Sequence, residues 1–375
     1  MKFQCLQDNL KKGLQAVGRV PHKSSNLPIL QNILLNATEK GVIECVGNNL
    51  EMGVRTTIRG KVEKEGSYTF EARLLTEYVN LLPNERVDVE LRDETLEVEC
   101  ANYHTKIHGV PATEFPPLPQ AEKKNPLTCS ALQFREALEQ VLFTVSSHES
   151  RQEISGVYLN YIPSEKVLIL VGTDSYRLGE RKVVVYNGPK NELTTIIPLR
   201  TLQELMRILQ SVEGEDERIV LYVQEGQILF TLDTIEIVSR LIEGSYPEYR
   251  QIIPQNISTT SIVSTSAMLR LVKSTSLFSK AGVFDIVFAF DVEKQQITLT
   301  ASSAQFGENA VTLEGEIKGK SITTTLNHRY VSEGLQALQS DRVSIKISDS
   351  NMPCIFEPAD DPKKPYLYLV MPIRR

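Results

Sequence analysis

The feature that most constrains the fold of this chain is an internal repeat. Positions near the N-terminus and positions 124 residues further along hold similar side chains over an extended stretch. The matched pairs are Phe3 and Leu127, Cys5 and Cys129, Leu10 and Phe134, Leu14 and Leu138, Val17 and Val141, Leu30 and Ile154, Ile33 and Val157, Leu35 and Leu159, and Asn36 and Asn160. Because a sustained repeat marks successive copies of one structural unit, we expect a chain of similar domains.

The repeat extends into a third copy. The corresponding segments are VGNNLEMG (46–53), VGTDSYRLGE (171–180) and ASSAQFGE (301–308), and then the helix-like segments 71–83, 198–210 and 327–339. In the second of these helix-like segments, Leu202, Leu205, Met206 and Leu209 have the spacing i, i+3, i+4, i+7. That spacing places them on one face of a helix, so the segment is predicted to be an amphipathic helix that packs against a core.

Each copy also contains strand patterns. Apolar and polar residues alternate at 87–109, 218–244 and 285–303, with turn residues between the runs, and this is typical of hairpins. The third copy opens with a further helical segment at 266–278. Each copy is therefore predicted to be a strand-rich α+β domain with two helices.

Proline-containing segments separate the copies. The first copy ends at 109–119 and the second at 243–254, and both segments suit extended linkers. The last segment, LVMPIRR (369–375), has its Met-Pro where the first copy has Val-Pro, so it is predicted to be the closing strand of a third domain. The predicted domains are residues 1–122, 127–254 and 255–375.

The composition is that of a globular protein. Apolar residues make up 41% and charged residues 23% of the chain. No apolar run reaches the ~20 residues that span a bilayer, and MKFQCLQDNLKK has no signal-peptide core, so we expect a cytoplasmic protein. The five cysteines include no C-x-x-C spacing, which favours buried thiols over disulfides or zinc ligands.

Three segments resemble chemical motifs without meeting their requirements. EGEIKGKS (314–321) lacks one residue of a phosphate-binding loop, so we expect a hairpin turn. His104 and His108 lie in a strand-like segment, where exposed polar positions are favoured over metal ligands. GTDSYRLGE (172–180) has no partnered histidine, so its Asp and Ser are expected to cap a turn rather than to act in catalysis.

Basic residues recur at equivalent places in the three copies. Arg73, Arg200 and Arg329 stand near the start of the second helix of each copy. Further basic residues in or near predicted helices are Lys11, Lys12, Arg19, Lys23, Arg207, Lys273 and Lys280. If equivalent helices face a common axis, these charges line one surface although the net charge is −6; helices that are simply solvated are the alternative.

Taken together, these segments resemble the bacterial DNA sliding clamps, the beta subunits of the replicative DNA polymerase III holoenzyme. The resemblance covers essentially the whole chain. Besides the three copies, it rests on MKF at the start, LPILQNILL (27–35), GTDSYRLG (172–179), LIEGSYPEYRQIIP (241–254) and YLVMPIRR (368–375).

The resemblance implies the DNA clamp fold, with three similar domains per chain. Each domain is expected to place two helices on the inner face and antiparallel sheets outside, and two chains are expected to close head to tail into a ring around double-stranded DNA. No catalysis and no cofactor are implied. The implied partners are a second copy of the chain, the replicative polymerase, an ATP-dependent clamp loader, repair polymerases and mismatch-repair proteins, the proteins binding through short apolar peptides.

The resemblance also implies site residues. The peptide-binding pocket would comprise Ile154, Thr173, Tyr176, Arg177, Leu178, Pro247, Gln251, Ile252, Phe284, Asn327, Tyr330, Pro353, Leu369, Val370, Met371, Pro372, Ile373 and Arg374. DNA would meet Lys23, Ser24, Arg73, His148, Arg151 and Gln152. The dimer interface would lie near Ile107 in the first domain and near Leu277 and Phe278 in the third.

Two other functions remain open from the residues alone. One is an enzyme that uses GTDSYRLGE, for example a hydrolase, whose turnover would depend on Asp174 and Ser175. The other is a three-domain scaffold that uses the same pocket and does not bind DNA. No role is assigned to Arg375.

Overall fold

A computed structural model describes most of the chain. The described residues are 1–21, 27–38, 40–146, 151–212, 214, 216–280, 282–360 and 365–374. They divide into two compact units. Unit 1 comprises Met1–Leu132, Tyr186–Pro189 and Gln203–Leu241, and unit 2 comprises Gln133–Val185, Lys190–Leu202 and Ile242–Arg375.

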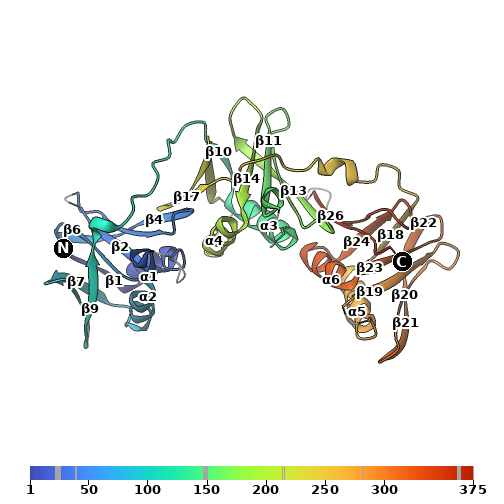
Figure 1. Cartoon of the computed structure of the whole chain (residues 1–375), viewed down its shortest axis with the longest axis horizontal. Helices are drawn as coiled ribbons and strands as arrows, with labels where there is room; N and C mark the ends of the chain where they lie inside the picture. The colour runs from blue at the N-terminus through green and yellow to red at the C-terminus, as the bar shows by residue number, and fades with distance from the viewer. Residues whose placement is uncertain are drawn as a thin grey trace. The chain divides into compact units, whose positions relative to one another are not determined.

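Each copy of the repeat contains two α-helices, as predicted (Figure 1). They are α1 Gln7–Val17, α2 Ala72–Leu81, α3 Ala131–Val141, α4 Leu199–Leu209, α5 Thr265–Ser276 and α6 His328–Ala337. The apolar face predicted for α4 is confirmed, because Leu202, Leu205 and Leu209 are buried and Met206 is half-buried. The pairs α1/α2 and α5/α6 each pack side by side within their units.

Side chains that precede the helices help to start them. The Glu71 carboxylate accepts a hydrogen bond from the Leu74 amide before α2 (2.5 Å), and the Ser264 hydroxyl accepts one from the Ala267 amide before α5 (3.4 Å). The Asn327 side chain accepts a hydrogen bond from the Arg329 amide before α6 (2.9 Å). Each bond satisfies an amide that has no partner inside its helix.

Short 3-10 helices also occur along the chain. They are η1 Pro28–Gln31, η2 Ala112–Glu114, η3 Leu142–Thr144, η4 Gln152–Ile154 and η5 Tyr249–Ile252. Two of them, η2 and η5, lie within the proline-containing segments that the sequence assigned to linkers.

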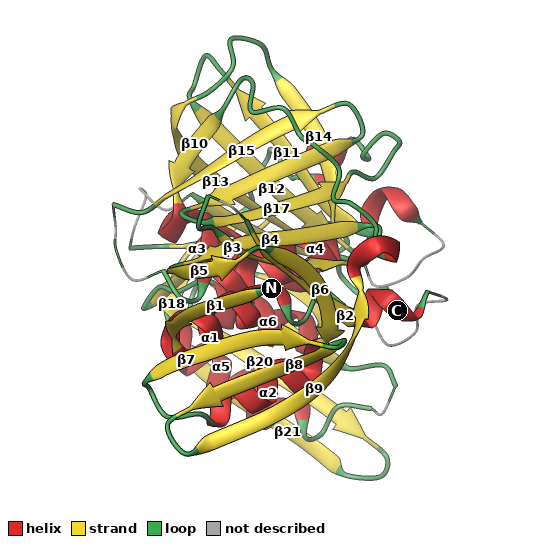
Figure 2. Cartoon of the chain, turned by 90° about the vertical axis from the view of Figure 1, so that its left-hand side faces the viewer, coloured by secondary structure: helices red, strands yellow, loops and turns green. Residues whose placement is uncertain are grey.

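Unit 1 is built on antiparallel strands that are seen face-on in Figure 2. The strands are β1 Lys2–Leu6, β2 Asn32–Ala37, β3 Ile43–Asn48, β4 Met52–Ile58, β5 Gly60–Lys64, β6 Gly66–Glu71, β7 Arg86–Arg92, β8 Thr95–Cys100, β9 Tyr103–Pro111, β10 Leu127–Ser130, β15 Arg218–Gln224, β16 Gln227–Leu232 and β17 Ile235–Arg240. The hairpins predicted at 87–109 and 218–244 are confirmed. Strand β17 of the second copy pairs with β4 of the first.

Unit 2 repeats this arrangement. Its strands are β11 Gly156–Ile162, β12 Val167–Thr173, β13 Arg177–Asn187, β14 Leu193–Pro198, β18 Thr259–Ser264, β19 Asp285–Asp291, β20 Gln296–Ser303, β21 Gly307–Glu314, β22 Glu316–Gly319, β23 Ile322–Asn327, β24 Arg342–Ile347, β25 Cys354–Pro358 and β26 Tyr366–Val370. Strand β26 of the third copy pairs with β13 of the second. A closing strand is present as β26, but it contains only Leu369 and Val370 of the predicted segment 369–375, and residues 371–374 follow it outside any strand.

The helices bury their apolar faces against these sheets. In the third copy, Met268 and Val272 of α5 and Leu335 of α6 share one core with Phe288 and Tyr368 of the strands. Full burial of one such side chain contributes about 1.5–3 kcal/mol. The predicted α+β class is thus confirmed, with antiparallel sheets that are covered by helices.

The sequence also makes predictions about the cysteines, the segment 314–321 and the membrane character of the helices. All five cysteines are buried free thiols, as predicted, and burial raises the pKa of the Cys129 thiol to about 12. The hairpin turn predicted at 314–321 is wrong, because the segment runs through β22, which pairs with β18 rather than with its sequence neighbours. None of the helices in the described part of the chain combines the length and the apolar character needed to cross a bilayer.

Candidate functional site

The turn between β12 and β13 is held by its own side chains. The Asp174 carboxylate accepts hydrogen bonds from the amides of Tyr176 and Arg177 (both 3.0 Å). The Thr173 hydroxyl accepts from the Ser175 amide (3.1 Å) and donates to the Arg177 carbonyl (2.6 Å). The Asp174 side chain therefore caps the turn, as the sequence predicts, and presents Tyr176 outward with 63% of its surface exposed.

The C-terminal tail lies against this turn. Strand β26 pairs with β13 so that Val370 faces Arg177 and Leu369 faces Leu178. Beyond the strand, the Met371 amide donates to the Tyr176 carbonyl (2.8 Å). The Ile373 amide then donates to the carbonyl of Thr325 on β23 (2.8 Å). The tail thus joins a turn of the second copy to a strand of the third.

Arg177 is the most heavily bonded side chain of the turn. Its Nε donates to Asp174 (2.9 Å), and its Nη1 donates to Glu333 on α6. The guanidinium carbon lies 4.6 Å from the ring centre of Tyr330 and 5.4 Å from that of Phe143. Burial acts to lower the pKa of Arg177, but the hydrogen bond to Glu333 and the nearby negative charges outweigh it, so the pKa is raised and the group stays charged.

An apolar cluster supports the turn and the tail from below. Leu178 and Leu369 are fully buried against Tyr249 of η5. Tyr246 stacks on Tyr158 with 4.9 Å between ring centres, and the Tyr249 hydroxyl donates to Glu180 (2.6 Å). Met371 packs against the same cluster and is only partly buried. The tail therefore rests on a rigid aromatic base.

The predicted pocket residues separate into an accessible rim and a buried support. Tyr176, Pro247, Gln251, Ile252 and Arg374 are exposed, with 40% of Ile252 accessible. The buried members are Ile154, Thr173, Leu178, Pro353, Leu369 and Val370. The Ser146 amide donates to the carbonyls of both Ile154 (3.3 Å) and Thr173 (3.1 Å), which brings these two residues together.

Asn327 and Tyr330 lie at the start of α6, with Phe284 beside them in the loop before β19, and the predicted residues Pro372 and Ile373 are half-buried in the tail. Phe284 has a positive φ of 59°, and its carbonyl accepts from the His328 amide (2.8 Å). The Arg329 guanidinium lies 3.6 Å from the ring centre of Phe284. Asn327 caps α6, and Tyr330 faces Arg177. The structure thus links the α6 start to the turn through Tyr330, while Phe284 is engaged with Arg329.

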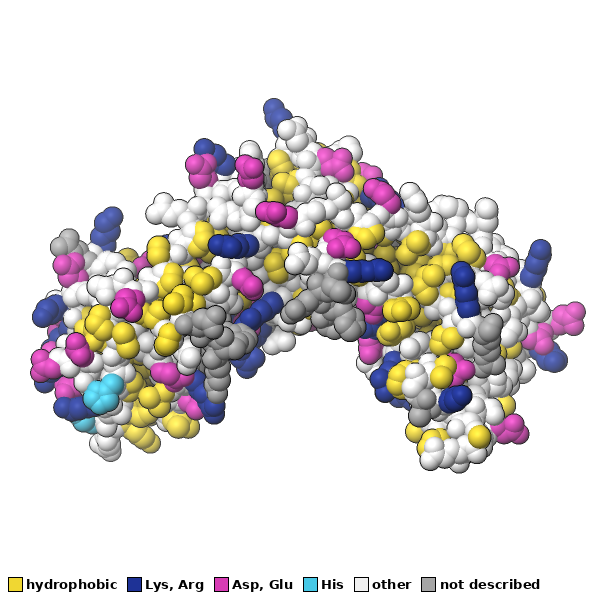
Figure 3. All heavy atoms as spheres, viewed as in Figure 1, with side chains coloured by type: hydrophobic (Ala, Val, Ile, Leu, Met, Phe, Trp, Pro, Cys, Tyr) yellow, Lys and Arg dark blue, Asp and Glu magenta, His cyan; other side chains and the backbone are white. Residues whose placement is uncertain are grey.

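The predicted DNA-contacting residues lie in both units. Arg73 is exposed on α2 and donates to Glu77 (2.7 Å). Arg151 donates to the Ser175 hydroxyl (3.1 Å), which places it beside the β12–β13 turn, and Gln152 is exposed on η4. Lys23, Ser24 and His148 lie outside the described residues. On the face shown in Figure 3, basic side chains are interspersed with acidic ones, in keeping with the modest net charge.

The residues predicted for a dimer interface differ in accessibility. Leu277 is 72% exposed after α5, and Phe278 is half-buried. The side chain of Ile107 on β9 is buried within its own unit. Leu81 and Tyr103, which also belong to the first copy, are 77% and 49% exposed. The side chain of Ile107 therefore does not reach the surface, and in the predicted interface the contact would be made by other residues of β9.

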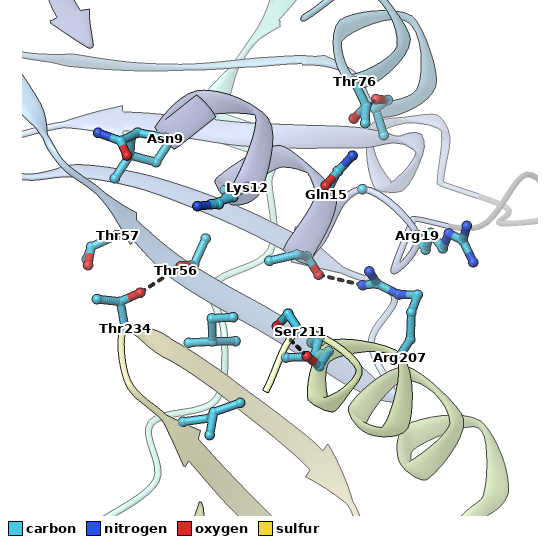
Figure 4. A pocket seen from close by; sticks show the side chains of 18 of the residues that line it. Asn9, Lys12, Gln15, Arg19, Thr56, Thr57, Thr76, Arg207, Ser211 and Thr234 are labelled. Carbon is cyan, nitrogen blue, oxygen red and sulfur yellow. Dashed lines mark hydrogen bonds between the residues drawn. The ribbon is translucent and has the colours of Figure 1, made fainter. Parts of the chain in front are cut away.

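Unit 1 contains a cleft of about 1160 Å³ between α1, the start of α2, the end of α4 and the β16–β17 turn (Figure 4). Arg207 Nη2 donates to the Ala16 carbonyl across it (3.0 Å). The hydroxyls of Thr56 and Thr234 lie 3.5 Å apart. Arg73, a predicted DNA-contacting residue, and Arg19 line the cleft, whose charges include both signs.

Metal chemistry receives no support from the described residues. Within that part of the chain, no group of three or more His, Cys, Asp or Glu side chains could hold a metal ion. His104 and His108 are exposed on β9, as predicted; the first lies 3.2 Å from Glu99 and the second 3.3 Å from Thr95.

Sequence reasoning missed several residues of the candidate site. Glu333, Phe143 and Tyr249 contact Arg177 or the buried support but were not predicted. Glu333 follows Tyr330 by three positions, so helical spacing places it on the same side of α6. Nothing in the sequence signals the contact between Phe143 and Arg177, because the two residues meet only through the fold.

Comparisons with known proteins match the whole chain. Models of the N-terminal, central and C-terminal domains of the DNA polymerase III beta subunit match residues 1–119, 128–248 and 250–374. The "Beta sliding clamp" of Synechococcus elongatus is 31% identical over 381 residues, covering 100% of this chain and 99% of that protein. The chain belongs to the beta sliding clamp family.

Other members of the family agree with this assignment. The "Beta sliding clamp" of Bacillus subtilis is 25% identical over 384 residues, covering 100% of both chains. A crystal structure of the DNA polymerase sliding clamp from Bacillus subtilis has a TM-score of 0.92, with 23% identity and coverage of 100% and 99%. A DNA polymerase III beta subunit from Thermotoga maritima has the same TM-score with 22% identity and the same coverage. The structural likeness confirms the three-domain clamp fold.

Proposed function

We propose that this chain is a DNA-replication processivity factor. Two copies form a head-to-tail ring around double-stranded DNA and tether the replicative polymerase. The chain acts by binding and has no catalytic activity of its own. The observation that carries the proposal is the full-length family match together with the three consecutive domain models, because tethering by encirclement needs all three domains.

The position of three arginines supports contact with phosphates. Arg73, Arg200 and Arg329 are each the second residue of the second helix in their copy, and all three are exposed. A cation near a helix N-terminus faces the positive end of the helix dipole and is disfavoured by about 0.3–1 kcal/mol. Glu77 pairs with Arg73 and the ring of Phe284 lies against Arg329, and a phosphate would add a favourable anionic contact at all three positions. Phosphate contacts of this kind hold DNA without reading its sequence.

The ring would close through free sheet edges. Among the described residues, β21 pairs only with β20, and residues 103–108 of β9 pair only with β8. Free edges promote association with another chain, so pairing of β9 with β21 of a second copy would cover both. The exposed Leu277 and Tyr103 would add apolar contact, with Ile107 and Phe278 next to them. The domains of the ring correspond to residues 1–122, 127–254 and 255–375.

Partner proteins would bind at the β12–β13 turn and the tail. The exposed Tyr176 and Ile252, with the partly buried Met371, offer apolar contact over a rigid base. Arg177 and the backbone supply the few polar groups that orient a ligand. This surface suits a short peptide with apolar anchors, which the replicative polymerase, the clamp loader, repair polymerases and mismatch-repair proteins would each present. A protein with this role acts in the cytoplasm, where bacterial replication takes place.

The test is topological. The chain is loaded onto a nicked circular plasmid by a clamp loader with ATP, and the complex is then isolated by gel filtration. We expect the chain to stay on the circle and to be lost after a restriction enzyme linearises the DNA, because a ring slides off free ends. Equal retention on circular and linear DNA would contradict encirclement. A restriction enzyme that has no site on the plasmid is the control.

A further inference from the structure

The junction between the first and second copies repeats the framework of the candidate peptide site. We call the β3–β4 turn together with β17 the first frame, and the β12–β13 turn together with β26 the second frame. In the first frame, Asn49 Oδ1 accepts from the amides of Glu51 (3.1 Å) and Met52 (2.8 Å), as Asp174 does in the second. Leu50 has a φ of 73°, and its counterpart Ser175 has one of 77°.

The strand that enters each frame is bound in the same way. Ser239 of β17 faces Met52, as Val370 of β26 faces Arg177. The next amide, that of Arg240, donates to the Glu51 carbonyl (2.9 Å), and its counterpart is the Met371 amide on the Tyr176 carbonyl. The two frames therefore share the turn, the strand register and the bond that follows the strand.

The frames hold different residues at several buried positions, including Ser239 and Val370 on the entering strands, and at one of these positions the first frame has no side chain. The second frame has Leu178, which is fully buried, where the first has Gly53. A Cβ added to Gly53 would lie 2.1 Å from Cδ2 of Leu118. The side chain of Leu118, from the connector between the copies, thus occupies the space that Leu178 fills with its own side chain.

Because Leu118 replaces the missing side chain of Gly53, the connector packs directly on the first frame. The side chain of Asn48 donates to the Pro116 carbonyl (3.0 Å), and Leu118 packs against the cluster of Ile29, Leu30 and Phe115. A cavity of only about 10 Å³ remains beside Pro119, which is no more than the space of one water molecule. The connector between the second and third copies is residues 243–254. In it, Ile252 follows Tyr249 by three residues, as Leu118 follows Phe115, but the side chain of Ile252 remains 40% exposed.

We propose that the first frame is a second docking site for peptides with apolar anchors, closed by the connector segment 116–119 of the chain itself. The proposal rests on the proposed function, in which the second frame docks such peptides. A segment tethered in the same chain has a high effective concentration, so a free peptide does not displace it. The chain therefore offers one open site, although its repeat builds two.

The test counts bound peptides. A synthetic peptide with one leucine and one phenylalanine is titrated into the full-length chain by isothermal calorimetry. The variant Gly53→Leu/Leu118→Ala rebuilds the wall of the first frame as in the second and removes the side chain that closes it. We expect the unmodified chain to bind one peptide and this variant to bind two. Adding Arg177→Ala to the variant should reduce the count to one by weakening the second frame.

The outcomes separate the two proposals. A variant that keeps its thermal midpoint and still binds one peptide overturns the latent site. An unmodified chain that binds no peptide contradicts peptide docking at the second frame, which belongs to the proposed function.

A second measurement covers a variant that does not fold. With Leu118→Ala alone, trypsin should cut after Lys123 or Lys124 about tenfold faster, because the connector loses one of its anchors. Val184→Ala, at a position that is 54% exposed on β13, is the matched control and should leave the rate unchanged. Cleavage at the same rate in both variants and in the unmodified chain would show that Leu118 does not hold the connector, and the proposal would fall.

Discussion

Replacing Gly334 by alanine should destabilise the third copy, although alanine is the better helix former. Gly334 is buried on α6 and faces the ring of Tyr368 on β26. A Cβ at this position would lie 2.0 Å from Cε1 and 2.2 Å from Cδ1 of that ring. Ordinary contact begins at 3.4 Å, so the ring or the helix has to move.

The ring has little freedom to move. The Tyr368 hydroxyl donates to the Tyr330 carbonyl (2.9 Å), and the ring packs against those of Phe143 and Phe356 with centres 5.6 Å and 6.2 Å away. Overpacking of a rigid core costs about 1–3 kcal/mol. The gain in helix propensity from glycine to alanine is about 1 kcal/mol. We therefore expect Gly334→Ala to lose up to about 2 kcal/mol in net terms, since the clash lies at the severe end of this range.

Gly13→Ala on α1 is the matched control. Gly13 is also buried in a helix, and its added Cβ would meet Cγ1 and Cδ1 of Ile58 at 2.7 Å and 2.8 Å. The outer atoms of a flexible side chain yield more easily than a ring that is held on three sides, so this variant should change stability little. Scanning calorimetry measures both, and about 2–4 °C per kcal/mol is expected for a unit of this size. An unchanged midpoint for Gly334→Ala, or an equal loss in both variants, would refute the reasoning.

Two further predictions concern a buried hydroxyl and a histidine. The Tyr366 hydroxyl is buried and donates to the Gln140 carbonyl (2.9 Å), so Tyr366→Phe should lower the free energy of unfolding by about 1–2 kcal/mol, as measured by urea denaturation. Tyr186→Phe, at a 49% exposed position, is the control and should leave this free energy unchanged. Equal losses in the two variants would contradict the prediction. Burial and then the nearby Arg329 lower the pKa of His328, so the unfolded chain binds more protons and stability should fall as the pH drops through about 6.5. His328→Gln should weaken the decrease in thermal midpoint between about pH 7.5 and 5.5, and an unchanged decrease would exclude His328 as its source.

The sequence predicts the repeated elements well because local signals specify them. The helix that carries Leu202, Leu205 and Leu209 follows from apolar spacing, and the hairpins follow from alternation and turn residues. The polar cap at Asp174 also follows from local chemistry, since aspartate accepts hydrogen bonds from amides two and three residues ahead. Each of these features depends on residues that are close together in the sequence.

The contacts of the candidate site could not be predicted in the same way. Arg177 meets Glu333 across 156 positions, and the Tyr366 hydroxyl meets Gln140 across 226. The pairing of β13 with β26 helps to bring such residues together, and strand pairing between copies leaves no local signal. Of the pocket residues taken from the family resemblance, six are buried and would support a site rather than line its surface.

A repeat can conserve a backbone framework while its copies take different roles. In both frames, one polar side chain caps the turn and one amide continues the strand, so the framework survives as long as those bonds do. The buried position is not fixed by these bonds, and it can be filled from the turn by Leu178 or from the connector by Leu118. The source of one apolar side chain thus decides whether the connector covers the frame or leaves it accessible. At this position, the two copies of one framework differ in which segment supplies the buried apolar side chain.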